Sequence, residues 1–93
     1  MILENVKTFI KDAFAVEEVT DEQANNVQLA LNELSDREER AVRLYYGLDD
    51  RPRTYAEVAR HFEVDEETVR EILRKSRIKM RLLARKIMMF GDK

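Results

Sequence analysis

Residues 54–73 read TYAEVARHFEVDEETVREIL, and this stretch decides the fold. An apolar face that includes Val58 and Phe62 is followed by a polar turn and then by a second apolar face with Val69 and Ile72. Apolar residues spaced by three and four positions are typical of amphipathic helices. The stretch therefore predicts a short helix, a tight turn and a second helix that packs back across the first.

Five residues fix the details of this helical hairpin. Ala59 is small where the two helices cross, and Val64 fills the turn. Thr54 and Glu57 have the spacing of a capping box, and Asp65 is a natural N-cap for the second helix. Many helical hairpins share this pattern, but the second helix also has the layout of one that enters a DNA major groove. Its exposed face is expected to carry Glu66, Glu67, Arg70, Glu71 and Arg74.

The sequence before this hairpin has the same periodicity and predicts three more helices. The first helix covers about residues 2–16. Capping-box pairs open the second helix after Thr20 and the third after Ser35, and the second is expected to reach about Leu34. Gly47 suits the left-handed exit of the third helix.

The last helix keeps its apolar spacing from Val69 to about Phe90, where Gly91 can end it. The sequence thus predicts an all-α fold, a small helical domain of about five helices with a helix-turn-helix and a long C-terminal helix. We expect a single domain over residues 1–93, because this length suits one compact unit. Its parts are an N-terminal helical extension over 1–33, the helix-turn-helix unit over 34–82 and a continuation of the last helix over 83–93.

Composition narrows the class of protein. Two glycines, one proline and 39% charged residues are typical of a helical protein. Because there is no cysteine, disulfides and thiolate metal sites are excluded. No apolar run approaches the roughly 20 residues that a membrane span needs, and the N-terminus does not have the pattern of a signal peptide. We expect a cytoplasmic protein without a membrane segment, a cofactor or a metal ion.

Charge is distributed unevenly along the chain. Residues 1–50 carry 5 Lys and Arg against 12 Asp and Glu, whereas residues 51–93 carry 12 against 7. Within residues 70–86 the count is 8 against 1. This asymmetry suggests that one end of the protein meets an anionic partner, although a solvated helix rich in Arg and Lys would give the same count.

The sequence over roughly residues 31–81 resembles region 4 of bacterial sigma factors of the sigma-70 family. That family has an Arg-Glu pair, an apolar helix ending in YGL, a loop, a helix-turn-helix and a basic helix end. A LuxR-type four-helix module begins similarly, but it usually has a shorter link before its helix-turn-helix. The residues that match the sigma pattern are Leu34, Arg37, Glu38, Val42, Tyr46, Gly47, Leu48, Thr54, Glu57, Val58, Ala59, Phe62, Val64, Val69, Arg70, Ile72, Lys75, Lys79 and Arg81.

The resemblance implies two partners. In the family, the recognition helix binds the promoter −35 element of duplex DNA, and an apolar groove holds the flap of the RNA polymerase β subunit. By resemblance, Glu67 and Arg70 touch bases, while Thr54, Lys75 and Lys79 contact the DNA backbone. The full set of expected DNA-binding residues is Thr54, Glu66, Glu67, Thr68, Arg70, Glu71, Arg74, Lys75, Arg77, Lys79 and Arg81. The expected partner-binding residues are Leu34, Val42, Tyr45 and Tyr46.

Two positions depart from the family pattern. Glu66 stands where housekeeping members commonly have an arginine that reads guanine, and Glu71 stands where glutamine is frequent. A glutamate cannot donate to guanine, though it can accept from the N4 amino group of cytosine. We therefore do not expect the −35 sequence of housekeeping promoters to be the target. The acids of the first turn favour the helix dipole but weaken the attraction to phosphate.

These observations predict a small stand-alone transcription regulator that binds duplex promoter DNA, RNA polymerase, or both. The alternative is a protein-interaction module that mimics sigma region 4 without reading DNA, and a purely structural helical bundle is a third reading. An enzyme is not expected, since the carboxylates lack a nucleophile or base partner and His61 has no second metal ligand. The first helix could extend the core, cover the flap groove or form a dimer, so the oligomeric state stays open. A chain of 93 residues is not expected to hold the other sigma domains.

Overall fold

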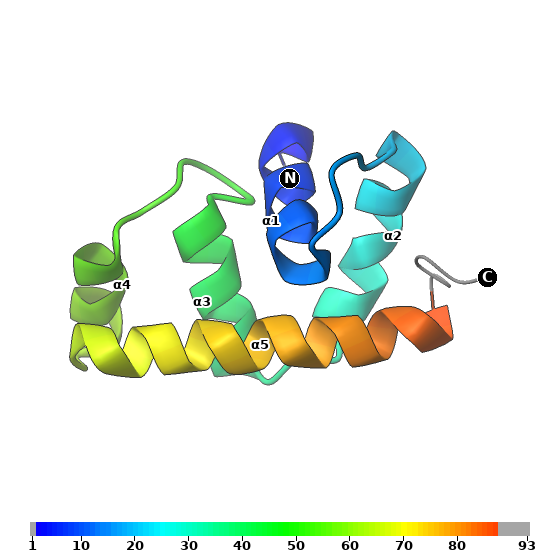
Figure 1. The fold of residues 1–93 in the computed structure, drawn as a ribbon. Helices are drawn as coiled ribbons and strands as arrows, with labels where there is room; N and C mark the ends of the chain where they lie inside the picture. Colours follow the sequence, from blue (N-terminus) through cyan, green and yellow to red (C-terminus); the bar gives the residue numbers. More distant parts are fainter. Residues whose placement is uncertain (1, 88–93) are drawn as a thin grey trace.

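The computed structural model describes residues 2–87, which form five helices and no strand (Figure 1). The prediction of an all-α fold with about five helices is confirmed for this part of the chain. The predicted end of the last helix near Phe90 lies outside the described residues. The helices are α1 (Leu3–Phe14), α2 (Asp21–Leu31), α3 (Asp36–Tyr46), α4 (Tyr55–Phe62) and α5 (Glu66–Ile87). Within residues 2–87, none of these helices combines the length and apolar character needed to cross a lipid bilayer.

Two helices end earlier than the sequence predicts. α1 stops at Phe14 because Ala15 takes the left-handed conformation, with φ of 55°. α2 stops at Leu31, since the next amides bond only three residues back: Glu33 N–H to the Ala30 carbonyl and Leu34 N–H to the Leu31 carbonyl. This tighter turn is of the 3₁₀ type, and it carries Leu34 into the core, where it is buried.

Local capping signals are confirmed at the start of three helices. In each case the N-cap hydroxyl accepts from the N3 amide, while the N3 side chain accepts from the N-cap amide. These reciprocal bonds satisfy backbone donors that a helix start otherwise leaves unpaired. The pairs are Thr20 with Gln23, Ser35 with Glu38, and Thr54 with Glu57. At the other end of α3, Gly47 provides the predicted left-handed exit with φ of 67°.

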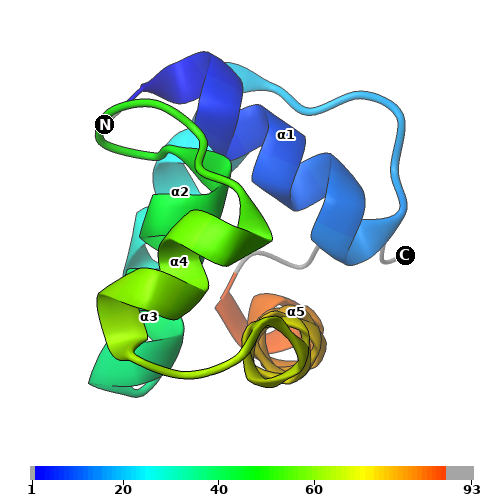
Figure 2. The same cartoon turned by 90° about the vertical axis from the view of Figure 1, so that its left-hand side faces the viewer.

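α5 is the element on which the other four helices pack. It runs beneath them in Figure 1, and Figure 2 looks along it, with α1 above and α3 and α4 to the left. A helix of 22 residues is about 33 Å long, which is long enough for α5 to contact all four other helices. Its inner face is fully buried at Val69, Leu73, Ser76 and Met80. The Ser76 hydroxyl satisfies its hydrogen bond within α5, donating to the Ile72 carbonyl at 2.7 Å.

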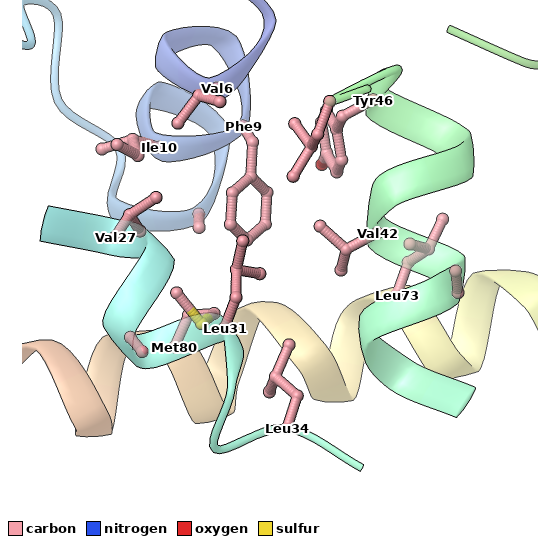
Figure 3. Packing of buried hydrophobic residues seen from close by; sticks show 14 of the residues in the cluster. Val6, Phe9, Ile10, Val27, Leu31, Leu34, Val42, Tyr46, Leu73 and Met80 are labelled. Atoms are coloured by element: carbon pink, nitrogen blue, oxygen red, sulfur yellow. The ribbon is translucent and has the colours of Figure 1, made fainter. Parts of the chain in front are cut away.

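The centre of the core is the ring of Phe9 from α1. It has no exposed surface, and in Figure 3 it points down toward Leu31 of α2, with Val42 of α3 at its side. Its centroid lies 5.0 Å from that of Tyr46, in a tilted aromatic pair. α1 therefore belongs to the same cluster of buried residues as the helix-turn-helix.

Polar contacts also tie α1 to the end of α3 and to α5. The Asn5 amide donates to the Gly47 carbonyl at 2.7 Å. The Tyr46 hydroxyl donates to Asp12 at 2.5 Å and accepts from Arg77 of α5 at 2.7 Å. Burial, together with the hydrogen bond to Asp12, raises the pKa of Tyr46 well above its usual range. The hydroxyl therefore keeps its proton, and this chain of bonds joins three helices at neutral pH.

Candidate nucleic-acid interface

The turn between α4 and α5 is short and closed by backbone hydrogen bonds. Glu63 takes the left-handed conformation with φ of 60°. The Val64 amide bonds to the Ala59 carbonyl at 3.0 Å, and the Glu63 amide bonds to the Arg60 carbonyl at 3.2 Å. This pattern satisfies the last carbonyls of α4 and turns the chain directly into α5. The predicted helix, tight turn and helix are thus present.

Asp65 caps the helix that follows this turn. Its Oδ1 accepts from the Thr68 hydroxyl at 2.6 Å and from the Thr68 amide at 2.8 Å. Both bonds favour the charged carboxylate, so they lower the pKa of Asp65 below its ordinary value. The acid at the start of α5 therefore has a structural role, which is to hold the first turn of that helix.

Replacing Asp65 with asparagine is expected to make the protein less sensitive to acid. Because the folded-state pKa is depressed, the carboxylate contributes stability above its unfolded pKa of about 3.9, and this contribution is lost as the pH falls through the folded value. Asparagine keeps a side-chain acceptor for the cap but does not titrate. Thermal melts of both proteins between pH 7 and pH 2.5 measure the effect. Melting temperatures that fall in parallel for both would contradict this role of Asp65.

The outer face of the first turns of α5 is open to solvent, and the five residues expected there are all exposed. Two of its arginines are held by acids three residues earlier. Arg70 Nη1 lies 3.5 Å from Glu67 Oε1, and Arg74 Nη2 lies 2.5 Å from Glu71 Oε2. Arg70 also lies over the ring of Tyr55 at 4.8 Å from its centroid, which orients it at the junction of α4 and α5. Exposed ion pairs of this kind are weak. A ligand that binds these arginines more strongly can therefore replace the two glutamates as their partners.

The other residues expected to bind DNA are spread over the start of α4 and different sides of α5. Thr54 is at the N-cap of α4, with its hydroxyl bound to the Glu57 amide. Arg77 turns inward to Tyr46, and Lys79 reaches across to Glu38 of α3 with an N–O distance of 2.8 Å. These two side chains leave α5 on different sides, since residues two apart on a helix point in different directions. The remaining members are Thr68, which is half-buried against Asp65, and Lys75 and Arg81, which are exposed.

The four residues expected to bind a protein partner are largely covered by the chain itself. Leu34, Val42 and Tyr46 are at most 6% exposed. Tyr45 is half-buried, and its ring stacks on Tyr55 with centroids 4.8 Å apart. In Figure 3 the side chains of Val42 and Tyr46 face Phe9 of α1. α1 therefore covers the apolar side of α3, and Val42 and Tyr46 do not form an open groove in this conformation.

Among the described residues, the carboxylates and His61 do not gather into a metal site. Over residues 2–87 no three His, Asp or Glu side chains are grouped in a way that could hold a metal ion. His61 is exposed, and its ring meets the edge of Phe62 at 5.1 Å. The main candidate surface is therefore the exposed face of α5, which carries Arg70 and Arg74. Together α4, the tight turn and α5 define a helix-turn-helix protein.

Comparison with known proteins identifies the family. Residues 30–82 match the family described as sigma-70, region 4, and the chain belongs to that family. The match covers α3, α4 and most of α5, whereas α1 and most of α2 precede it. Region 4 is the non-catalytic helix-turn-helix module of sigma factors, and it has a DNA-binding role in transcription.

Similar full-length proteins are sigma factors. RNA polymerase sigma factor SigA of Listeria monocytogenes is 46% identical over 68 residues, which are 72% of this chain and 17% of that protein. SigA of Listeria innocua gives the same values. SigA of Clostridium acetobutylicum is 48% identical over 52 residues, or 55% of this chain and 14% of its own length. The chain thus spans less than a fifth of these relatives, and no solved structure matches it.

Proposed function

We propose that this protein is a small transcription regulator that binds duplex promoter DNA through the exposed face of α5. The observation that carries the proposal is the presentation of this face by a helix-turn-helix. The turn at Glu63 and the cap at Asp65 set the direction of α5, so that one side of its first turns packs on α4 and the other side is exposed. A helix end exposed in this way can enter the major groove, where base edges are read.

The chemistry of the face indicates what it would read. Arg70 and Arg74 can donate to guanine O6 and N7, while Glu67 and Glu71 can accept from cytosine N4. Each Arg–Glu pair of the free protein would exchange its internal contact for contacts to G·C base pairs. Glu66 offers no donor to guanine, so the proposed target differs from the −35 element of housekeeping promoters.

Replacing Arg70 and Lys75 together with alanine is expected to weaken specific DNA binding strongly. One change removes a base contact and the other a phosphate contact, so affinity should fall at least about tenfold at 0.1 M salt. Fluorescence anisotropy of a labelled random-sequence duplex, titrated with salt, measures non-specific binding. Selection from a pool of random duplexes finds the specific site, and the same measurement is then repeated on it.

A matched control removes the same number of positive charges from a different part of the surface. Arg40 on α3 and Lys7 on α1 belong to none of the proposed contacts, and their double alanine variant should bind DNA nearly as the unchanged protein does. If both double variants lost affinity equally, general charge and not the face of α5 would explain binding. If the unchanged protein failed to bind any duplex at low salt, the proposal would be wrong.

A second candidate function is a protein-interaction module on RNA polymerase. It is favoured by the first turn of α5, where Asp65, Glu66 and Glu67 repel phosphate, and by the pairing of both arginines with acids. In sigma factors region 4 also binds the flap of the β subunit. Use of Val42 and Tyr46 for such a contact requires α1 to move, since both are buried. Binding to polymerase in the absence of DNA binding would favour this candidate.

A further inference from the structure

An open cleft separates α1 from the start of α4. Its α1 wall includes Thr8 and Lys11, and its opposite wall includes Arg53, Thr54 and Tyr55. The residues on the α1 side precede the part of the chain that matches the sigma family. The cleft is therefore a surface that the N-terminal helix adds to the helix-turn-helix.

The cleft is continuous with the proposed DNA-binding face. Thr54 and Tyr55 line it at the N-terminal end of α4, and Arg70 of α5 lies over the same Tyr55 ring. In helix-turn-helix proteins the first helix of the motif crosses the DNA backbone while the second enters the major groove. A strand that passes the N-terminus of α4 would therefore lie over the mouth of this cleft.

The charges that line the cleft suit an anionic ligand. Lys11 is exposed and forms no ion pair with the side chains of residues 2–83. Arg53 is paired with Asp50 at 3.2 Å, at the rim. The only acid among the lining residues is Asp12, and its Oδ2 accepts the Tyr46 hydroxyl, which in turn accepts from Arg77. Of the two cations that line the cleft, Arg53 has an ion pair to break and Lys11 has none within the described part of the chain.

We propose that this cleft receives the phosphate backbone of the duplex bound by α5, and that Lys11 makes the contact from α1. The inference rests on the DNA binding proposed above and extends it to a helix outside the family match. The contact would also offset the repulsion between DNA phosphates and the acidic first turn of α5. A cation on α1 would supply phosphate attraction beside the first turn of α5, where Glu66 and Glu67 repel phosphate.

The test is the salt dependence of binding, measured by anisotropy with a labelled duplex of about 20 base pairs of random sequence. Lys11→Ala is expected to reduce the slope of log affinity against log salt by about 0.9, and affinity at 0.1 M salt by up to about eightfold, which corresponds to one phosphate contact. Lys11→Arg should keep the slope. Lys7→Ala is the matched control, because Lys7 is on the same helix but its Nζ lies 2.6 Å from Asp21 of α2.

A second variant tests the position of the DNA strand by adding a negative charge to the cleft. Thr8→Glu places a carboxylate on the α1 wall without removing a cation, and it should weaken binding while thermal melts confirm that the fold is intact. If Lys11→Ala and Thr8→Glu bind like the unchanged protein, the strand does not cross the cleft, although α5 still binds DNA. If Lys7→Ala loses as much slope as Lys11→Ala, general charge explains the effect and the inference fails. If the unchanged protein binds no duplex, both proposals are overturned.

Discussion

Replacing Phe9 with alanine is expected to lower the free energy of unfolding by about 3–5 kcal/mol, the range for removal of a buried aromatic ring. The ring is fully buried, and it fills the space where α1, α2 and α3 meet above α5 (Figure 3). Alanine would leave a cavity there and remove the aromatic contact with Tyr46. Since small domains are stable by only about 5–15 kcal/mol, much of the total would be lost.

Urea denaturation followed by circular dichroism measures this change. Leu29→Ala is the control, because Leu29 lies on α2 with 59% of its surface exposed, and such a substitution should change stability by less than about 0.5 kcal/mol. The result bears on the role of α1. A loss below about 1 kcal/mol for Phe9→Ala would mean that α1 unfolds separately and that the helix-turn-helix is stable without it.

Gly47→Ala is expected to destabilise the protein by about 2–4 kcal/mol, from the left-handed backbone and from overpacking together. Gly47 has φ of 67°, and a Cβ at this position would lie 2.3 Å from the Arg51 carbonyl carbon and 2.3 Å from the Pro52 nitrogen. Both of these are backbone atoms, so the clash cannot be relieved by a change of side-chain rotamer. The α3–α4 loop would have to move.

Ala15→Gly provides the opposite change at a comparable backbone conformation. Ala15 ends α1 with φ of 55°, and glycine there should leave stability within about 0.5 kcal/mol or raise it slightly, because glycine adopts this conformation without strain. Urea midpoints of the two variants are compared with that of the unchanged protein. An equally stable Gly47→Ala protein would show that the α3–α4 loop adapts freely, contrary to its close packing.

The features that sequence alone predicted well are local ones. The capping boxes at Thr20, Ser35 and Thr54 depend on residues three positions apart, and Gly47 marks a conformation that few other residues adopt. Such signals lie within one turn of chain, so no knowledge of the tertiary structure is needed to read them. The early end of α1 escaped this reading, because Ala15 takes the left-handed conformation without being glycine.

The partners of long side chains could not be predicted in the same way. Arg77 belongs to the predicted DNA-binding set, and in the free protein it donates to Tyr46, 31 residues away in sequence. Lys79 reaches Glu38, 41 residues away. Both contacts depend on how α1 and α3 pack against α5, which periodicity does not specify. The same packing buries Val42 and Tyr46, which a sequence pattern shows only as apolar.

All four other helices pack on α5, and this affects when the protein can fold during its synthesis. α5 is the last of the five helices in the chain, so α1 to α4 leave the ribosome before the surface that completes their burial exists. Phe9 is complete about 70 residues before Met80, an interval of roughly 4–14 s at synthesis rates of about 5–20 residues per second. During that interval the apolar faces of the nascent helices are not yet covered by α5, and the native fold forms only after translation has passed Met80.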